Sequence, residues 1–109
     1  MEYEKITAVI KILENLKRII KAKETNIIFS TFNSIEDLIF ELDTHIYKLK
    51  DKDFSKISDL ILLFAPTSDL QEISMSSGWG KQFLDISKRF DRIIKELIEE
   101  FNLKAFSDN

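Results

Sequence analysis

Apolar residues recur along this chain at alternating steps of three and four positions, the spacing that places side chains on one face of an α-helix. Over residues 2–24 the repeat consists of Ile6, Val9, Leu13, Leu16 and Ile20. Glutamates stand at the start of this segment and basic residues at its end, which complements the helix dipole. The pattern predicts one helix over residues 2–24 with its apolar stripe in a core.

Residues 25–32 are ambiguous, because their β-branched and aromatic side chains favour an extended backbone. Ile27 lies seven positions beyond Ile20 and would also continue the helical stripe. We expect a mostly buried connection that leaves the first helix near Thr25.

A second helix is predicted to open at Asn33 or Ser34, either of which can cap it, with Glu36 or Asp37 three positions on as in a capping box. Its core stripe is formed by Ile35, Leu38, Ile39, Leu42, Ile46 and Leu49. A charged turn follows at residues 50–53.

Asp53 is expected to cap a third, shorter helix, which Pro66 ends because the residue before proline avoids the α region. The inward positions of this helix are Phe54, Ile57, Leu60, Ile61 and Phe64. Leu62 and Leu63 add apolar surface and predict burial on nearly all sides.

Residues 66–80 contain both glycines and the single proline, and are the least regular stretch. Ser68 with Gln71 three positions on predicts one or two helical turns there. The last helix is expected from Trp79 or Lys81 to Leu103. Its stripe is Phe83, Ile86, Phe90, Ile93, Leu97 and Phe101, and its i,i+4 ion pairs are Asp91–Lys95, Arg92–Glu96 and Lys95–Glu99. The chain is thus predicted to be all-α, a single-domain bundle over residues 1–109 of about four helices, with an irregular segment before the last helix.

Composition supports this fold and narrows the function. Of 109 residues, 44% are hydrophobic and 32% charged, which is typical of a globular chain, and two glycines with one proline leave few tight turns for a β-fold. The net charge of −3 argues against a nucleic-acid ligand. The acidic start is unlike a signal peptide, and the longest apolar run, residues 60–66, is too short to span a bilayer. We therefore expect a cytoplasmic protein with no membrane contact.

Catalytic and metal-binding patterns are largely missing from the sequence. The absence of cysteine excludes disulfides and thiolate metal sites. The single histidine, His45, stands one helical turn after Glu41, which gives at most half a metal site, and we expect it to be an ordinary surface or boundary residue. There is no phosphate-binding glycine loop and no nucleophile elbow. We expect no enzyme activity, no cofactor and no metal.

Two features are candidates for binding. With about 100° per residue, Glu36, Phe40, Asp43 and Tyr47 share the side of the second helix that faces away from its core stripe. They form either a docking surface for a basic partner, or a second buried face under a neighbouring helix or the segment before it.

The second candidate feature is the segment over residues 66–80. Trp79 is either a core residue, the more frequent outcome for a lone tryptophan in a small domain, or an exposed hot spot. Asp69, Gln71 and Glu72 are expected to remain outside in both cases.

Over residues 60–92 the chain resembles small helical immunity proteins encoded beside polymorphic or contact-dependent growth-inhibition toxins of bacteria. The resemblance is carried by Phe64-Ala65-Pro66-Thr67, Leu70-Gln71-Glu72-Ile73-Ser74, Gly78-Trp79-Gly80, Phe83-Leu84 and Phe90-Asp91. It does not extend to the N-terminal half. It implies a cytoplasmic protein that binds the catalytic domain of a cognate toxin, commonly a nuclease with a basic surface, and blocks its active site.

The residues and the resemblance together leave two main functional hypotheses, and a bundle enzyme, which would need a metal, is a third. The first is a toxin inhibitor whose partner-binding residues are Glu36, Phe40, Asp43, Tyr47, Asp69, Gln71, Glu72 and Trp79. The second is a structural or regulatory helical module, for example a homodimer that buries Phe40 and Tyr47 against a second copy. The oligomeric state stays open between them.

Overall fold

The chain folds into five helices in a computed structural model that describes residues 3–22, 24–27, 30–66 and 68–103. They are α1 (Glu4–Ala22), α2 (Ile35–Lys50), α3 (Ile57–Leu63), α4 (Asp69–Ser76) and α5 (Gly80–Glu100). No strand occurs among the described residues. The predicted all-α class is confirmed, with one more helix than expected.

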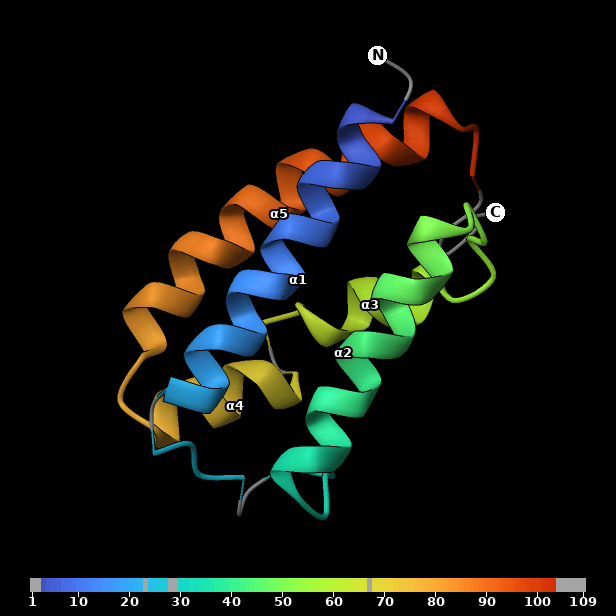
Figure 1. The fold of residues 1–109 in the computed structure, drawn as a ribbon. Coiled ribbons are helices and arrows are strands. Elements are labelled where there is room, and N and C mark those ends of the chain that lie inside the picture. The colour runs from blue at the N-terminus through green and yellow to red at the C-terminus, as the bar shows by residue number, and fades with distance from the viewer. Residues whose placement is uncertain (1–2, 23, 28–29, 67, 104–109) are drawn as a thin grey trace.

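The longest helices lie side by side, with α1 between α5 and α2, while the short α3 and α4 cross behind them (Figure 1). Every helix contributes fully buried apolar side chains to one continuous core, among them Leu16, Leu42, Leu60, Leu70 and Phe90. The stripe predicted for α1 is buried throughout. A single core of this kind explains why each helix is amphipathic.

The connection from α1 to α2 is less buried than predicted. Thr25 donates its hydroxyl to the carbonyl of Ile20 at 2.9 Å and so closes the end of α1. Ile27 and Phe32 pack against the core but are only partly buried, and Asn26 is exposed. Residues 28 and 29, which the prediction also covered, lie outside the described part of the chain.

Helix α2 begins where its cap was predicted. Ser34 is the N-cap, and its hydroxyl accepts a hydrogen bond from the backbone N–H of Asp37 at 3.1 Å. The central stripe residues of α2 are buried, whereas Ile35 and Ile39 are partly buried at its edge. This edge forms part of the groove described below.

Helix α3 departs from the prediction in two ways. It begins at Ile57, and Asp53 instead accepts the backbone N–H of Ser55 at 3.0 Å in the turn that precedes it. Leu62 is 53% exposed, so the expected burial on all sides is wrong. A helix of seven residues has room to pack only one side, which α3 does through Ile57 and Leu60.

The segment predicted to be irregular is mostly helix α4. Ser68 is its N-cap and accepts the backbone N–H of Gln71, as the capping-box pattern predicted. Burial of Leu70 and Ile73 extends those first turns into a helix of eight residues. Gly78, with φ +85°, then makes the turn into α5, a backbone conformation that residues with a Cβ rarely adopt.

Helix α5 buries Phe83, Ile86, Phe90 and Leu97 of the predicted stripe. Ile93 and Phe101 are only partly buried, and Ile94 is more deeply buried than Ile93. Its three predicted i,i+4 ion pairs do not form among the described residues. Instead Lys5 of α1 lies 3.8 Å from Glu96 and 3.5 Å from Glu100, so these carboxylates link two helices. Pairs between exposed side chains on one helix are too weak to fix their geometry.

Phe90 is expected to be a principal source of stability. It is fully buried, and its ring centroid lies 3.9 Å from that of Phe64. Phe90→Ala should lower the free energy of unfolding by about 3–5 kcal/mol, measured by urea denaturation, because it leaves a cavity in the core. Leu84→Ala, at a half-exposed position of the same helix, is the control and should cost far less. Equal losses would contradict this account of the core.

Asp53 gives a prediction about pH. Hydrogen bonds from Ser55 and Lys48 lower the pKa of its carboxyl from 3.8 to about 2. The stability that this carboxylate adds is therefore complete above its unfolded pKa of 3.8 and is lost as the pH falls through 2. Ser55→Ala should raise the pKa of Asp53 towards 3.8, measured by NMR titration of the side-chain carbon, while Ser76→Ala should leave it unchanged. An unaltered titration in Ser55→Ala would show that the hydroxyl is not the main cause.

Candidate functional site

The outer face of α2 presents two aromatic side chains to solvent. Phe40 is 72% exposed and Tyr47 is 71% exposed, two turns apart on the same side of the helix. The alternative that these rings pack under a neighbouring element is therefore wrong for this chain. Large apolar side chains this exposed are uncommon on a folded surface and often mark an interaction site.

A groove of about 440 Å³ runs beside Phe40, between α2 and the carboxyl-terminal part of α1. Ile35 and Ile39 give it an apolar wall, Glu36 and Asp43 flank it from α2, and Lys21 flanks it from α1. The predicted residues Glu36, Phe40 and Asp43 are thus brought together in one concavity. Lys21 and the two isoleucines were missed, because the helical stripe assigned the isoleucines wholly to the core and no sequence pattern paired α1 with α2.

Asp43 is not a free carboxylate. Its Oδ1 accepts a hydrogen bond of 2.5 Å from Nζ of Lys17, which also lies 3.7 Å from Glu14. The hydrogen bond to Asp43 raises the pKa of Lys17, so the ammonium stays charged and balances the carboxylate. Glu36 and Asp37, in contrast, make no ion pair with any described residue. The unbalanced negative charge of this face therefore lies at the amino end of α2.

The candidates on α4 have separate roles. Asp69 accepts the backbone N–H of Thr31 at 3.2 Å and its hydroxyl at 2.5 Å, which ties α4 to the segment before α2. The amide of Gln71 donates to the sulfur of Met75 at 3.6 Å, and Glu72 is exposed. Asp69 is therefore engaged in structure, and Glu72 is the carboxylate of this group that stays accessible.

A second apolar surface lies beside these α4 candidates. Met75 is 63% exposed and Leu84 is 50% exposed, and both line a groove of about 250 Å³ between α4 and α5. The sequence did not indicate this groove, because α4 was predicted as only one or two turns and because the turn at Gly78 is needed to bring Met75 and Leu84 to the same groove.

Trp79 belongs to the core and not to the binding surface. It is 1% exposed, and its ring meets Phe83 edge to face at a centroid distance of 6.5 Å. The core alternative is confirmed, and Trp79 is withdrawn as a partner-binding residue. Its indole N–H has no hydrogen-bond partner among the described residues.

His45 is a buried residue, contrary to the expectation of a surface or boundary position. It is 2% exposed, and its Nε2 lies 2.9 Å from Oε2 of Glu41. This contact satisfies the polar ring where α2 faces the core. In the described part of the chain, no three side chains of His, Asp or Glu come close enough to hold a metal ion together.

Comparisons with protein-family models, with curated proteins and with solved structures give no match to this chain. Among the helices described here, none has both the length and the apolar character needed to cross a bilayer. The outer face of α2 with its groove is therefore the candidate site on geometry alone.

If the exposed rings of Phe40 and Tyr47 do not contribute to folding, their removal should leave the free energy of unfolding nearly unchanged. Phe40→Ala and Tyr47→Ala should each change the free energy of unfolding by less than about 0.5 kcal/mol. Leu42→Ala, on the buried side of the same helix, should lower it by about 2–5 kcal/mol. Urea denaturation followed by circular dichroism measures all three. A loss near that of Leu42→Ala for either aromatic variant would place that ring in the folded core.

Proposed function

We propose that this chain is an immunity-type inhibitor that binds a cognate toxin domain, with a basic surface, through the outer face of α2 and so blocks the toxin's active site. The observation that carries the proposal is the joint exposure of Phe40 and Tyr47 on one rigid helix. In this proposal the chain is not an enzyme, and it needs no cofactor or metal.

The aromatic rings would supply most of the binding energy. Exposed aromatic side chains lose little conformational freedom on binding and are enriched among the few residues that dominate interfaces. The groove beside Phe40 gives a partner side chain an apolar wall to enter, formed by Ile35 and Ile39. A docking surface with these features suits a protein partner better than a small polar substrate.

Charge would act mainly on the rate and specificity of binding. Glu36 and Asp37 at the amino end of α2 attract a basic partner, whereas Asp43 is already balanced by Lys17. Nucleases bind phosphates and therefore have basic clefts, which is the partner class that the resemblance over residues 60–92 implies. Asp69 joins α4 to Thr31, in the segment that precedes α2, and in this proposal the exposed Glu72 of α4 extends the interface.

The same exposed rings also favour a second candidate, a helical module that dimerises by burying Phe40 and Tyr47 against another copy. A two-fold interface needs a self-complementary surface, and an aromatic pair two turns apart can provide one. Analytical ultracentrifugation separates the two candidates. Only the dimer predicts a molecular mass that rises with protein concentration and that no longer rises when Phe40 and Tyr47 are replaced.

The test begins with tagged protein co-expressed with the open reading frame immediately upstream of its gene. We expect a stoichiometric complex, and we expect that frame expressed alone to kill cells unless this chain is present. Phe40→Ala and Tyr47→Ala should each weaken the complex about tenfold or more, measured by calorimetry. Glu36→Gln should reduce the salt dependence of the association rate more than Asp43→Asn does, since only Glu36 is unpaired.

Leu62→Ala is the matched control, since it removes an exposed apolar side chain from α3, away from the candidate site. Its affinity should stay within about twofold of the parent. A complex that tolerates both aromatic substitutions would refute the assignment of the α2 face. Absence of complex and of toxicity would refute the inhibitor proposal, and concentration-dependent mass would then favour the dimer.

A further inference from the structure

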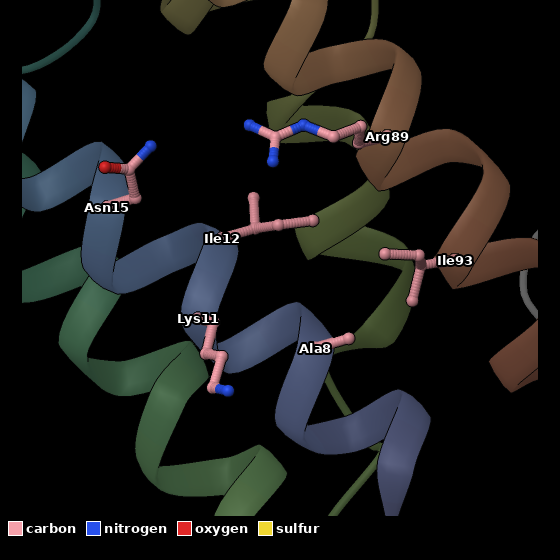
Figure 2. Close-up of a pocket in the computed structure, with 6 residues that line it drawn as sticks. All are labelled: Ala8, Lys11, Ile12, Asn15, Arg89 and Ile93. Carbon is pink, nitrogen blue, oxygen red and sulfur yellow. The ribbon is translucent and has the colours of Figure 1, made fainter.

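Another groove lies between α1 and α5, on the side of α1 that faces away from α2. It has a volume of about 270 Å³, and Ala8, Ile12 and Ile93 form its apolar floor (Figure 2). A smaller hollow of about 180 Å³ continues it along the same two helices and shares Asn15 and Arg89 with it. Together these form an elongated furrow, defined here as the α1–α5 furrow, with room for a side chain and the backbone that carries it.

Of the residues that the structure describes, two cations and no carboxylate line the larger of the two hollows of this furrow. Lys11 stands on its α1 rim and Arg89 on its α5 rim, where the guanidinium extends over the furrow towards Asn15 (Figure 2). Both cations are exposed, and neither makes a hydrogen bond or ion pair with another described residue. Asp85, one turn before Arg89, lines the smaller hollow and is exposed, but no ion pair joins it to Arg89. Asn15 accepts a hydrogen bond from Arg18.

The acidic residues at the far end of α5 do not neutralise these cations. Glu96 and Glu100 are held by Lys5, which joins α1 to α5 beyond Ala8. The furrow is thus bounded at one end by a satisfied ion-pair cluster and is cationic in its middle, although the whole chain has a net charge of −3. Such local charge reversal is not required for folding, because exposed charges contribute little to stability.

We propose that the α1–α5 furrow binds an acidic, amphipathic segment of another protein. An apolar side chain of that segment enters between Ala8, Ile12 and Ile93, and its flanking carboxylates lie beside Lys11 and Arg89. Arginine suits this role because its planar fork matches a carboxylate. The apolar floor favours a peptide over a nucleic acid, whose phosphates would gain nothing from the isoleucines.

This inference goes beyond the proposed inhibitor function and does not depend on it. The furrow is lined by α1 and α5, whereas the groove beside Phe40 is lined by α1 and α2. Helices α5 and α2 flank α1 on opposite sides (Figure 1). The two surfaces also select opposite charges, since the α2 face attracts a basic partner. Variants of one surface should therefore leave binding at the other intact.

The experiment uses the full chain, labelled for NMR, and a synthetic helical peptide of about 14 residues with two leucines four positions apart, flanked by glutamates. We expect shifts confined to residues of α1 and α5 on titration. The double variant Lys11→Glu, Arg89→Glu should weaken binding of the peptide about tenfold or more, because it reverses the charge of the furrow. The single variant Ala8→Phe should weaken it to a similar extent, because the larger ring fills the apolar floor without changing the charge. Lys88→Glu with Lys95→Glu changes the net charge equally on exposed positions outside the furrow and should stay within about twofold.

Two control experiments test the charge and the location of the site. A peptide with lysine in place of each glutamate should not bind. The double variant Phe40→Ala, Tyr47→Ala should bind the acidic peptide with the affinity of the parent chain. The proposal is overturned if the acidic peptide causes no shifts up to about 1 mM, or if its shifts map to α2. It is also overturned if a single-stranded oligonucleotide binds in its place and Ala8→Phe leaves that binding unchanged, because the furrow would then be a phosphate site.

Discussion

The stack of Phe64 on Phe90 is the contact on which the placement of α3 against α5 depends. A helix of seven or eight residues is not stable alone in water, so α3 and α4 must be held by packing. Phe64 ends α3 and lies between the rings of Phe83 and Phe90, with centroid distances of 5.9 and 3.9 Å. Trp79 adds an edge-to-face contact with Phe83 where α4 passes into α5. This aromatic cluster joins the end of α3 to α5, whereas α4 packs against α5 with its own buried side chains Leu70 and Ile73.

The long helices, in contrast, are organised by α1. Its buried stripe contacts α2 on one side and α5 on the other, and ion pairs at Lys17 and Lys5 add a polar contact to each neighbour. The outer face of α2 is consequently presented by a helix whose other side is fully packed. A rigid support of this kind lowers the entropy lost when Phe40 and Tyr47 are immobilised by a partner.

The local sequence pattern was sufficient to predict the long helices and the N-caps of α2 and α4. Ser34 and Ser68 cap the helices that their sequence context predicted, since a capping box involves only four consecutive residues. Errors arose where two local arrangements compete and where packing decides. Asp53 accepts the backbone N–H of Ser55 in a turn instead of capping α3. Packing buries His45 on α2, and it extends α4 beyond the predicted one or two turns by burying Leu70 and Ile73. The exposure of Phe40 and Tyr47 was one of two outcomes that the helical period allowed, and packing alone could decide between them. The ion-pair partner of Asp43 could not be predicted either, because Lys17 lies 26 positions away in the sequence.

The position of α1 between the two grooves has a thermodynamic consequence. Lys21 of α1 flanks the groove beside Phe40, and Ala8, Ile12 and Asn15 of the same helix line the α1–α5 furrow. A displacement of α1 would have to disturb its ion pairs with both α5 and α2. Any effect that occupation of one groove had on the affinity of the other would be the same in both directions, because linkage between two binding equilibria is reciprocal. Such an effect would have to pass through α1, since α1 contributes residues to both grooves.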